Sequence, residues 1–129
     1  MVSIAGRLLF STECSLIWSA IGIGLAIAHF LLKKNCRLVV VSRSKEPLEK
    51  LNAEYPGRVQ VLAADLSDLT IGQKAANTAL AAWKRIDGLI VNHGVLEPIK
   101  RISEFEPSEW QKAFDTNVFS AVAIVRDTR

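Results

Sequence analysis

The chain has 129 residues, which suffices for one domain and is too short for two of typical size. Half of the residues are hydrophobic and 22% are charged, so the composition excludes a disordered chain. The net charge of +3 comes from lysines and arginines that are spread along the chain. We therefore expect no nucleic-acid partner, because no basic patch is evident.

The two cysteines, Cys14 and Cys36, form no C-x-x-C motif and no cluster with histidine, so we expect no metal site. Two reduced thiols are typical of a cytoplasmic protein, which is the location we expect. Residues 16–32 leave an alternative open, because these 17 residues are nearly all apolar and two lysines follow them. A small membrane-anchored protein is therefore the second interpretation.

From residue 22 onward, helical and strand patterns alternate along the chain. The predicted order is helix 22–34, strand 37–42, helix 44–55, strand 59–63, helix 67–85, strand 86–92 and helix 107–126. Asn35 is expected to end the first helix, while Ser44 and Ser67 are candidate caps for the second and third. The run Leu38–Val41 is continuously apolar, which predicts a strand covered on both faces.

This alternation predicts an α/β fold, a partial Rossmann-like doubly wound parallel sheet with helices on both faces. Such a sheet should open with a strand before the first helix. In residues 1–20, only Leu8–Phe10 and Leu16–Trp18 are candidates, and neither leads into a good turn. We therefore expect no convincing first strand in this segment.

Short motifs stand at the ends of the predicted strands. Gly22-Ile23-Gly24 opens the first helix, where glycines let backbone N–H groups approach a phosphate whose charge the helix dipole favours. Alone, this G-x-G pair is a weak signal, because small residues also serve close helix packing. Further motifs follow in order: Ser42-Arg43, Asp65-Leu66-Ser67, Asn92-His93-Gly94, and Asn117 within residues 114–118.

With these motifs in this order over residues 22–120, the chain resembles the short-chain dehydrogenase/reductase family. The resemblance implies a nicotinamide dinucleotide cofactor and a small carbonyl or alcohol substrate. It implies that the cofactor lies against Gly22, Ile23 and Gly24 (pyrophosphate), Ser42 and Arg43 (adenosine ribose), Asp65 and Leu66 (adenine), and Asn92 and Gly94 (nicotinamide ribose). Asn117 matches the helix-borne catalytic asparagine of the family.

Arg43 bears on the choice of cofactor. An acid at the strand end would bind a ribose 2′-hydroxyl, whereas an arginine suits a 2′-phosphate, so we expect NADP(H) and regard NAD(H) as the less favoured cofactor. Simpler interpretations stay open for several residues. Arg43 is then an ordinary surface arginine and Asp65 a loop acceptor for its own backbone. His93, where the family carries alanine, then has no catalytic role.

Two departures from the family decide the expected activity. Trp18 and Ile17 fall where the family has its first glycine and its threonine, and a tryptophan there would strain a tight turn. The family's catalytic serine, and its tyrosine followed four residues later by lysine, are absent: Tyr55, the sole tyrosine, precedes Val59. We therefore expect an atypical segment 1–21 and a truncated NAD(P)-binding Rossmann-type domain 22–129. A damaged or mis-assembled gene product is one explanation.

The main functional hypothesis is an NADP(H)-dependent oxidoreductase of this family that is inactive as the present chain. An active enzyme would need its missing half from another chain. The alternatives are a catalytically dead nucleotide-binding or pairing module and the membrane-anchored protein. Self-association is expected through exposed strand edges or through the helix 107–126.

Overall fold

The computed structural model describes residues 14–18, 22–65, 67–97 and 99–128. Four parallel strands form one sheet in the order β3-β2-β1-β4. The elements in chain order are β1 (Cys14–Trp18), α1 (Ile23–Lys33), β2 (Arg37–Ser42), α2 (Lys45–Glu54), β3 (Val59–Ala63), α3 (Ile71–Trp83), β4 (Gly88–Val91), η1 (Ile102–Glu104), α4 (Pro107–Phe114), the π-helical turn η2 (Asp115–Phe119) and α5 (Ser120–Asp127).

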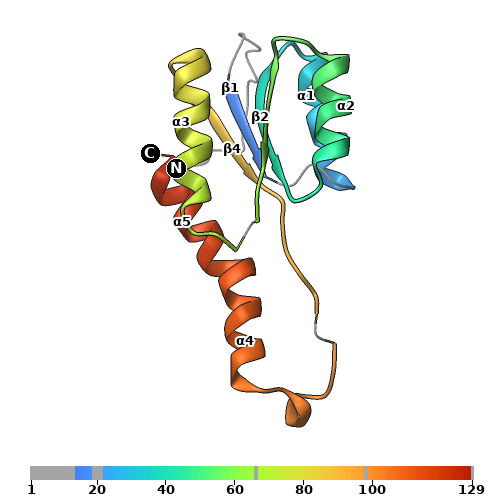
Figure 1. Cartoon of the computed structure of the whole chain (residues 1–129), viewed down its shortest axis with the longest axis vertical. Helices are drawn as coiled ribbons and strands as arrows, with labels where there is room; N and C mark the ends of the chain where they lie inside the picture. The colour runs from blue at the N-terminus through green and yellow to red at the C-terminus, as the bar shows by residue number, and fades with distance from the viewer. Residues whose placement is uncertain (1–13, 19–21, 66, 98, 129) are drawn as a thin grey trace, which may run out of the picture.

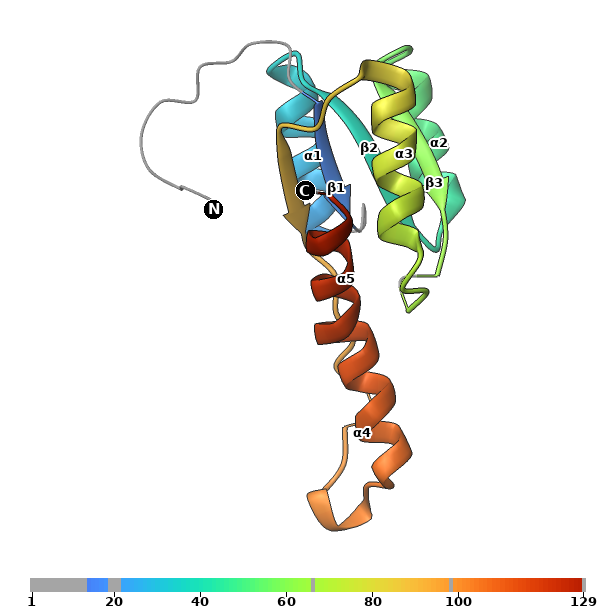
Figure 2. The same cartoon turned by 90° about the vertical axis from the view of Figure 1, so that its left-hand side faces the viewer.

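Helices cover both faces of the sheet, as the sequence predicts for a doubly wound fold (Figures 1 and 2). In β2, Leu38 and Val40 contribute to the core that α1 and α2 cover, whereas Val39 and Val41 face the core of α3 and α5. All four side chains are fully buried. This confirms that the apolar run is a strand covered on both faces. Because neither face of β2 contacts water, its side chains do not alternate between apolar and polar.

The expectation that residues 1–20 contain no convincing first strand is wrong. Residues 14–18 form β1, which lies inside the sheet and pairs in parallel with β2 and with β4. Leu16 lies opposite both Val39 and Leu89 in the register. Two neighbouring strands stabilise β1 through backbone hydrogen bonds that a local pattern does not reveal.

Trp18 is the last residue of β1, and it pairs with Val41 and Val91. Its backbone therefore continues the strand, and the strain expected from a left-handed turn at this position does not arise there. Residues 19–21, where the family's turn would follow, lie outside the described residues. Part of the segment set apart as atypical thus belongs to the same sheet as the strands that follow it.

Within the apolar stretch 16–32, residues 16–18 belong to β1 and residues 23–32 belong to α1, which has 11 residues. Within the part of the chain that the structure describes, no helix combines the length and hydropathy needed to cross a membrane. One side of α1 instead contributes to the core, where Ala28 and Leu32 are fully buried, while Phe30 is exposed.

Helix ends follow the predictions in part. Asn35 ends α1 with a φ of 65°, and the N–H groups of Asn35 and Cys36 donate to the carbonyls of Leu32 and Leu31, which is the Schellman arrangement. Ser67 does not cap α3, which begins at Ile71. Its N–H and hydroxyl both donate to Asp65 Oδ1, so these residues form a turn of their own.

The helix predicted over residues 107–126 is present as α4, η2 and α5 in unbroken succession, and it runs well beyond the sheet (Figure 2). Pro107 occupies its first position behind a capping box in which Glu106 and Glu109 satisfy each other's backbone N–H groups. The π-helical turn, which the sequence pattern does not show, lies around Asn117. Such turns are frequent at functional sites.

Candidate nucleotide site at the carboxyl edge of the sheet

The carboxyl ends of four parallel strands meet at one edge of the sheet. After β1 the chain forms β2 and then β3 on one side of it, and it then crosses to form β4 on the other side of β1. The direction in which strands are added therefore reverses between β1 and β4. In open α/β sheets, ligands bind in the crevice at such a switch point. The predicted residues Gly22, Arg43, Asp65 and Asn92 all follow the ends of these strands within a few residues.

Gly22 precedes α1 with a φ of +59°, a conformation that side chains rarely adopt. Apart from the adjoining residues, no described atom lies within 4 Å of the place where a Cβ of residue 22 would stand. No described side chain caps the helix, and Ile23 is 73% exposed, so the first turn is accessible to an anion. Gly24 is buried in α1, which indicates a packing role beside any contact with a phosphate.

Arg43 and Asp65 follow the ends of the neighbouring strands β2 and β3, and Arg43 is exposed. Hydrogen bonds from the Ser67 N–H and hydroxyl hold the pKa of Asp65 below its ordinary value, and attraction by the Arg43 guanidinium adds to this. Asp65 is therefore ionised, and its carboxylate accepts hydrogen bonds within its own loop, which is the simpler interpretation of this residue given above. Both side chains remain accessible to a ligand at this edge.

Two further predicted residues have different surroundings. Ser42 is buried, and its hydroxyl oxygen accepts the N–H of Ser44 at 3.3 Å, so it stabilises the turn that leads into α2. Leu66 lies outside the described residues. A contact of either side chain with a nucleotide stays a prediction.

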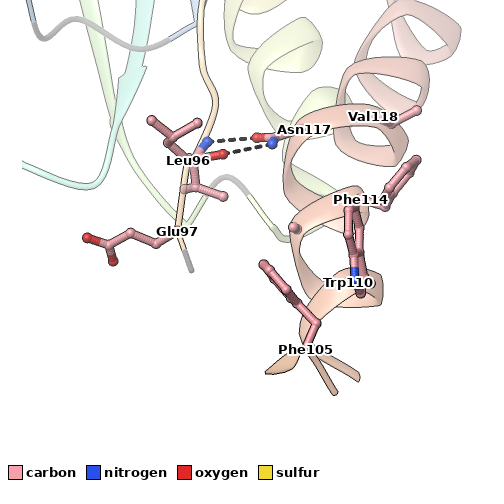
Figure 3. Close-up of a pocket in the computed structure, with 9 residues that line it drawn as sticks. Leu96, Glu97, Phe105, Trp110, Phe114, Asn117 and Val118 are labelled. Carbon is pink, nitrogen blue, oxygen red and sulfur yellow. Dashed lines mark hydrogen bonds between the residues drawn. The ribbon is translucent and has the colours of Figure 1, made fainter. Parts of the chain in front are cut away.

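Asn117 holds the loop that follows β4. Its Oδ1 accepts the N–H of Val95 at 2.7 Å, and its Nδ2 donates to the carbonyl of Val95 at 2.8 Å (Figure 3). A Cβ at Gly94 would stand 3.3 Å from Asn117 Oδ1, so a glycine allows this close approach. In this structure the Asn117 amide positions the loop. The catalytic role that the family resemblance implies for Asn117 stays a prediction.

Sequence reasoning missed the contacts of His93. Its Nε2 lies 3.0 Å from the carbonyl oxygen of Thr116 and 2.6 Å from Ser120 Oγ, so the side chain joins the loop after β4 to the π-helical turn. Partial burial lowers the pKa of His93, which the contact with the Thr116 carbonyl offsets in part. The one signal in the sequence was a histidine where the family carries alanine.

A largely apolar groove of about 290 Å³ lies between this loop and the helix, next to Asn117 (Figure 3). The rings of Phe105 and Trp110 are 5.0 Å apart at its outer end. The groove is lined by Val95, Leu96, Glu97, Phe105, Trp110, Ala113, Phe114, Asn117 and Val118. Trp110 and Phe114 lie four residues apart on one side of α4, a signal that sequence reasoning did not use.

Comparison with known proteins is consistent with this geometry. The sequence profile of the short chain dehydrogenases matches residues 16–128. The chain belongs to the short-chain dehydrogenase/reductase family. It is 39% identical over 109 residues to an uncharacterized oxidoreductase of Schizosaccharomyces pombe, with 84% of this chain and 43% of the relative aligned. An uncharacterized oxidoreductase of Saccharomyces cerevisiae is 35% identical over 106 residues, with 81% and 42% aligned.

Solved structures of the family agree with the fold. A crystal structure of a short-chain dehydrogenase/reductase from Saccharomyces cerevisiae has a TM-score of 0.83 at 32% identity, and covers 89% of this chain and 47% of that one. A metagenomic short-chain oxidoreductase in complex with NADP has a TM-score of 0.81 at 29% identity, with 91% and 55% covered. The chain thus spans less than half the length of the curated relatives it matches.

Proposed function

We propose that this chain is the nucleotide-binding half of an NADP(H)-dependent oxidoreductase, and that it binds NADP(H) in preference to NAD(H). The observation that carries this proposal is the exposed Arg43 at the carboxyl end of β2, next to the switch point of the sheet. In full-length members of the family, the substrate would be a small carbonyl compound or alcohol.

The described residues suit a dinucleotide. The open first turn of α1 offers backbone N–H groups to a pyrophosphate, and the left-handed Gly22 leaves room for its approach. Arg43 offers charge-assisted hydrogen bonds to a 2′-phosphate, each worth about 1.5–3 kcal/mol. Asp65 accepts hydrogen bonds at the adenine end, while Asn92 and Gly94 lie on the loop after β4, where the nicotinamide ribose would bind.

When bound, NADP(H) supplies or accepts the hydride. This chain's own residues bind and orient the nucleotide, and Asn117 holds the loop beside it through Val95. The proton donor of the family's reaction, a tyrosine with a lysine four residues later, is absent from the sequence. The chain by itself is therefore proposed to bind nucleotide without turning over substrate.

Calorimetric titration of the chain with NADPH and with NADH tests this proposal. We expect tighter binding of NADPH, and we expect Arg43→Asp to reverse the preference, because the carboxylate repels a 2′-phosphate and accepts from a 2′-hydroxyl. Arg101→Asp is the matched control, since it makes the same charge change at another exposed arginine. Equal affinity for both nucleotides, or an equal effect of the two substitutions, would contradict the assignment of Arg43.

A pairing module is the second candidate, favoured by apolar side chains along α4, η2 and α5. Trp110, Phe114, Val118, Val122 and Val125 recur every three or four residues and are all exposed. Among the described strands, β4 pairs with β1 alone, so its other edge offers backbone groups to a further strand. Either surface supports self-association or pairing with a polypeptide that carries the second half of the fold.

A further inference from the structure

His93 connects the loop after β4 to the helix that carries Asn117. We propose that His93 is a positioning residue which, by tying this loop to Thr116 and Ser120, sets the place of Gly94 and Val95 at the nucleotide edge. Only the nucleotide experiment below rests on the proposed function, because the hydrogen bonds themselves belong to the free chain.

The three short contacts of this cluster determine where the protons lie. Ser120 Oγ is 2.5 Å from the Thr116 carbonyl oxygen, which has no hydrogen, so the serine hydroxyl donates to it. His93 Nε2 lies 2.6 Å from the same Oγ and 3.0 Å from the same carbonyl. Both of those atoms are acceptors toward the ring, so Nε2 carries a proton and His93 is the donor.

The π-helical turn explains why the Thr116 carbonyl is open to side chains. In a regular α-helix this oxygen would accept the N–H of Ser120, four residues later. Here the Ser120 N–H donates to the carbonyl of Asp115, five residues back. The Thr116 carbonyl therefore receives the Ser120 hydroxyl and the His93 ring in place of that N–H.

Two attachments bracket Gly94. On one side, His93 donates to Thr116 and Ser120. On the other, the amide of Asn117 binds both backbone groups of Val95. Both attachments end on the same widened turn, and Ser120 is buried beneath it. One attachment would leave the loop able to pivot about Val95, whereas two fix its position and orientation.

Ser120 is not a nucleophile in this arrangement. It is 1% exposed, and its proton is directed to the Thr116 carbonyl rather than to the histidine ring. The pair therefore does not match the serine–histidine arrangement of hydrolases, where the histidine accepts the serine proton. Its chemistry is that of a structural clamp at a ligand-binding loop.

Three substitutions of His93 separate the hydrogen bond from side-chain bulk. In His93→Gln the amide nitrogen stands where Nε2 stood and can donate to both acceptors. In His93→Asn the nitrogen is one bond too short, and His93→Ala removes the side chain. His29→Ala on α1 is the control, because that histidine lies beside Glu54, away from the loop.

The first measurement is amide hydrogen exchange at Val95 in the nucleotide-free chain. We expect exchange about three- to tenfold faster in His93→Ala and His93→Asn, the range that the loss of one neutral hydrogen bond produces. His93→Gln and His29→Ala should exchange like the parent. If His93→Gln exchanges as fast as His93→Asn, or if no variant differs from the parent, the proposal is wrong. The comparison of Gln with Asn decides the matter even if His93→Ala does not fold.

The second measurement compares NADPH with adenosine 2′,5′-bisphosphate, which lacks the nicotinamide half. We expect His93→Ala and His93→Asn to weaken NADPH binding about three- to tenfold and to leave the affinity for adenosine 2′,5′-bisphosphate unchanged. We expect His93→Gln to bind NADPH with the affinity of the parent. Equal weakening of both ligands would overturn the positioning role. If the parent binds neither ligand, the proposed function fails, and the exchange of Val95 alone decides the role of His93.

Discussion

Gly72 of α3 lies against Ile124 of α5 so closely that a Cβ on the glycine would stand 2.9 Å from the Cα of Ile124. Both residues are buried, and Ile124 packs in the same cluster as Val39 and Val41 of the central sheet. The absent side chain at position 72 is thus what lets the long C-terminal helix reach the core.

Gly72→Ala should therefore destabilise the fold. The added methyl group meets backbone, which cannot move aside as a flexible side chain would, and overpacking of this kind costs about 1–3 kcal/mol. The gain in helix propensity, close to 1 kcal/mol, offsets part of this cost. Urea unfolding measures the difference, with Gln73→Ala at the exposed neighbouring position as the control. A Gly72→Ala variant as stable as the control would show that α3 and α5 are not in close contact.

The stability of the chain should fall as the pH decreases from 7.5 toward 5.5. Burial holds the pKa of His93 below its ordinary value of 6.5, so the unfolded chain takes up this proton before the folded chain does. The stabilisation from His93 is complete above pH 6.5 and is lost as the pH falls through the folded-state pKa. Unfolding of the parent and of His93→Gln at several pH values isolates this contribution. Parallel pH profiles for the two proteins would contradict it.

The purified chain should show no dehydrogenase or reductase activity. The absence of a general acid–base group costs about 10²–10⁴ in rate, and the loss should be larger because catalytic residues act as a unit. Oxidation of NADPH with a panel of small carbonyl compounds measures this, with a full-length family member of known activity as the positive control. Turnover above the rate without protein would overturn the expectation.

Val122→Glu should reduce self-association. Val122 is 62% exposed in the middle of the apolar stripe from Trp110 to Val125, and contiguous apolar patches on soluble proteins commonly mark interfaces. A carboxylate there would be desolvated in any helix-to-helix contact. Sedimentation velocity measures the change, and Asn77→Glu on the exposed side of α3 is the control. If both variants associate like the parent, the β4 edge is the remaining candidate.

Much of the sheet and of the candidate site was predictable because its signals are local. The apolar run of β2, the turn at Asn35, and the motifs after β1, β2, β3 and β4 are each contained within a few residues. The family resemblance implied that residues as far apart in the chain as Gly22 and Asn92 serve one nucleotide site. Both follow strand ends, and parallel strands place their carboxyl ends at one edge of the sheet.

Tertiary structure alone decided the rest. The strand β1 has a weak local pattern, and it forms because β2 and β4 both pair with it. The partners of His93 lie 23 and 27 residues further along the chain: Thr116 in a π-helical turn and Ser120 directly after it. No periodicity in the sequence predicts this turn. Hydrophobic periodicity and turn motifs depend on the solvent exposure of a segment and on its neighbours in the sequence. Hydrogen bonds between distant segments exist only once the helix after β4 has packed back against the sheet, so no local pattern contains them.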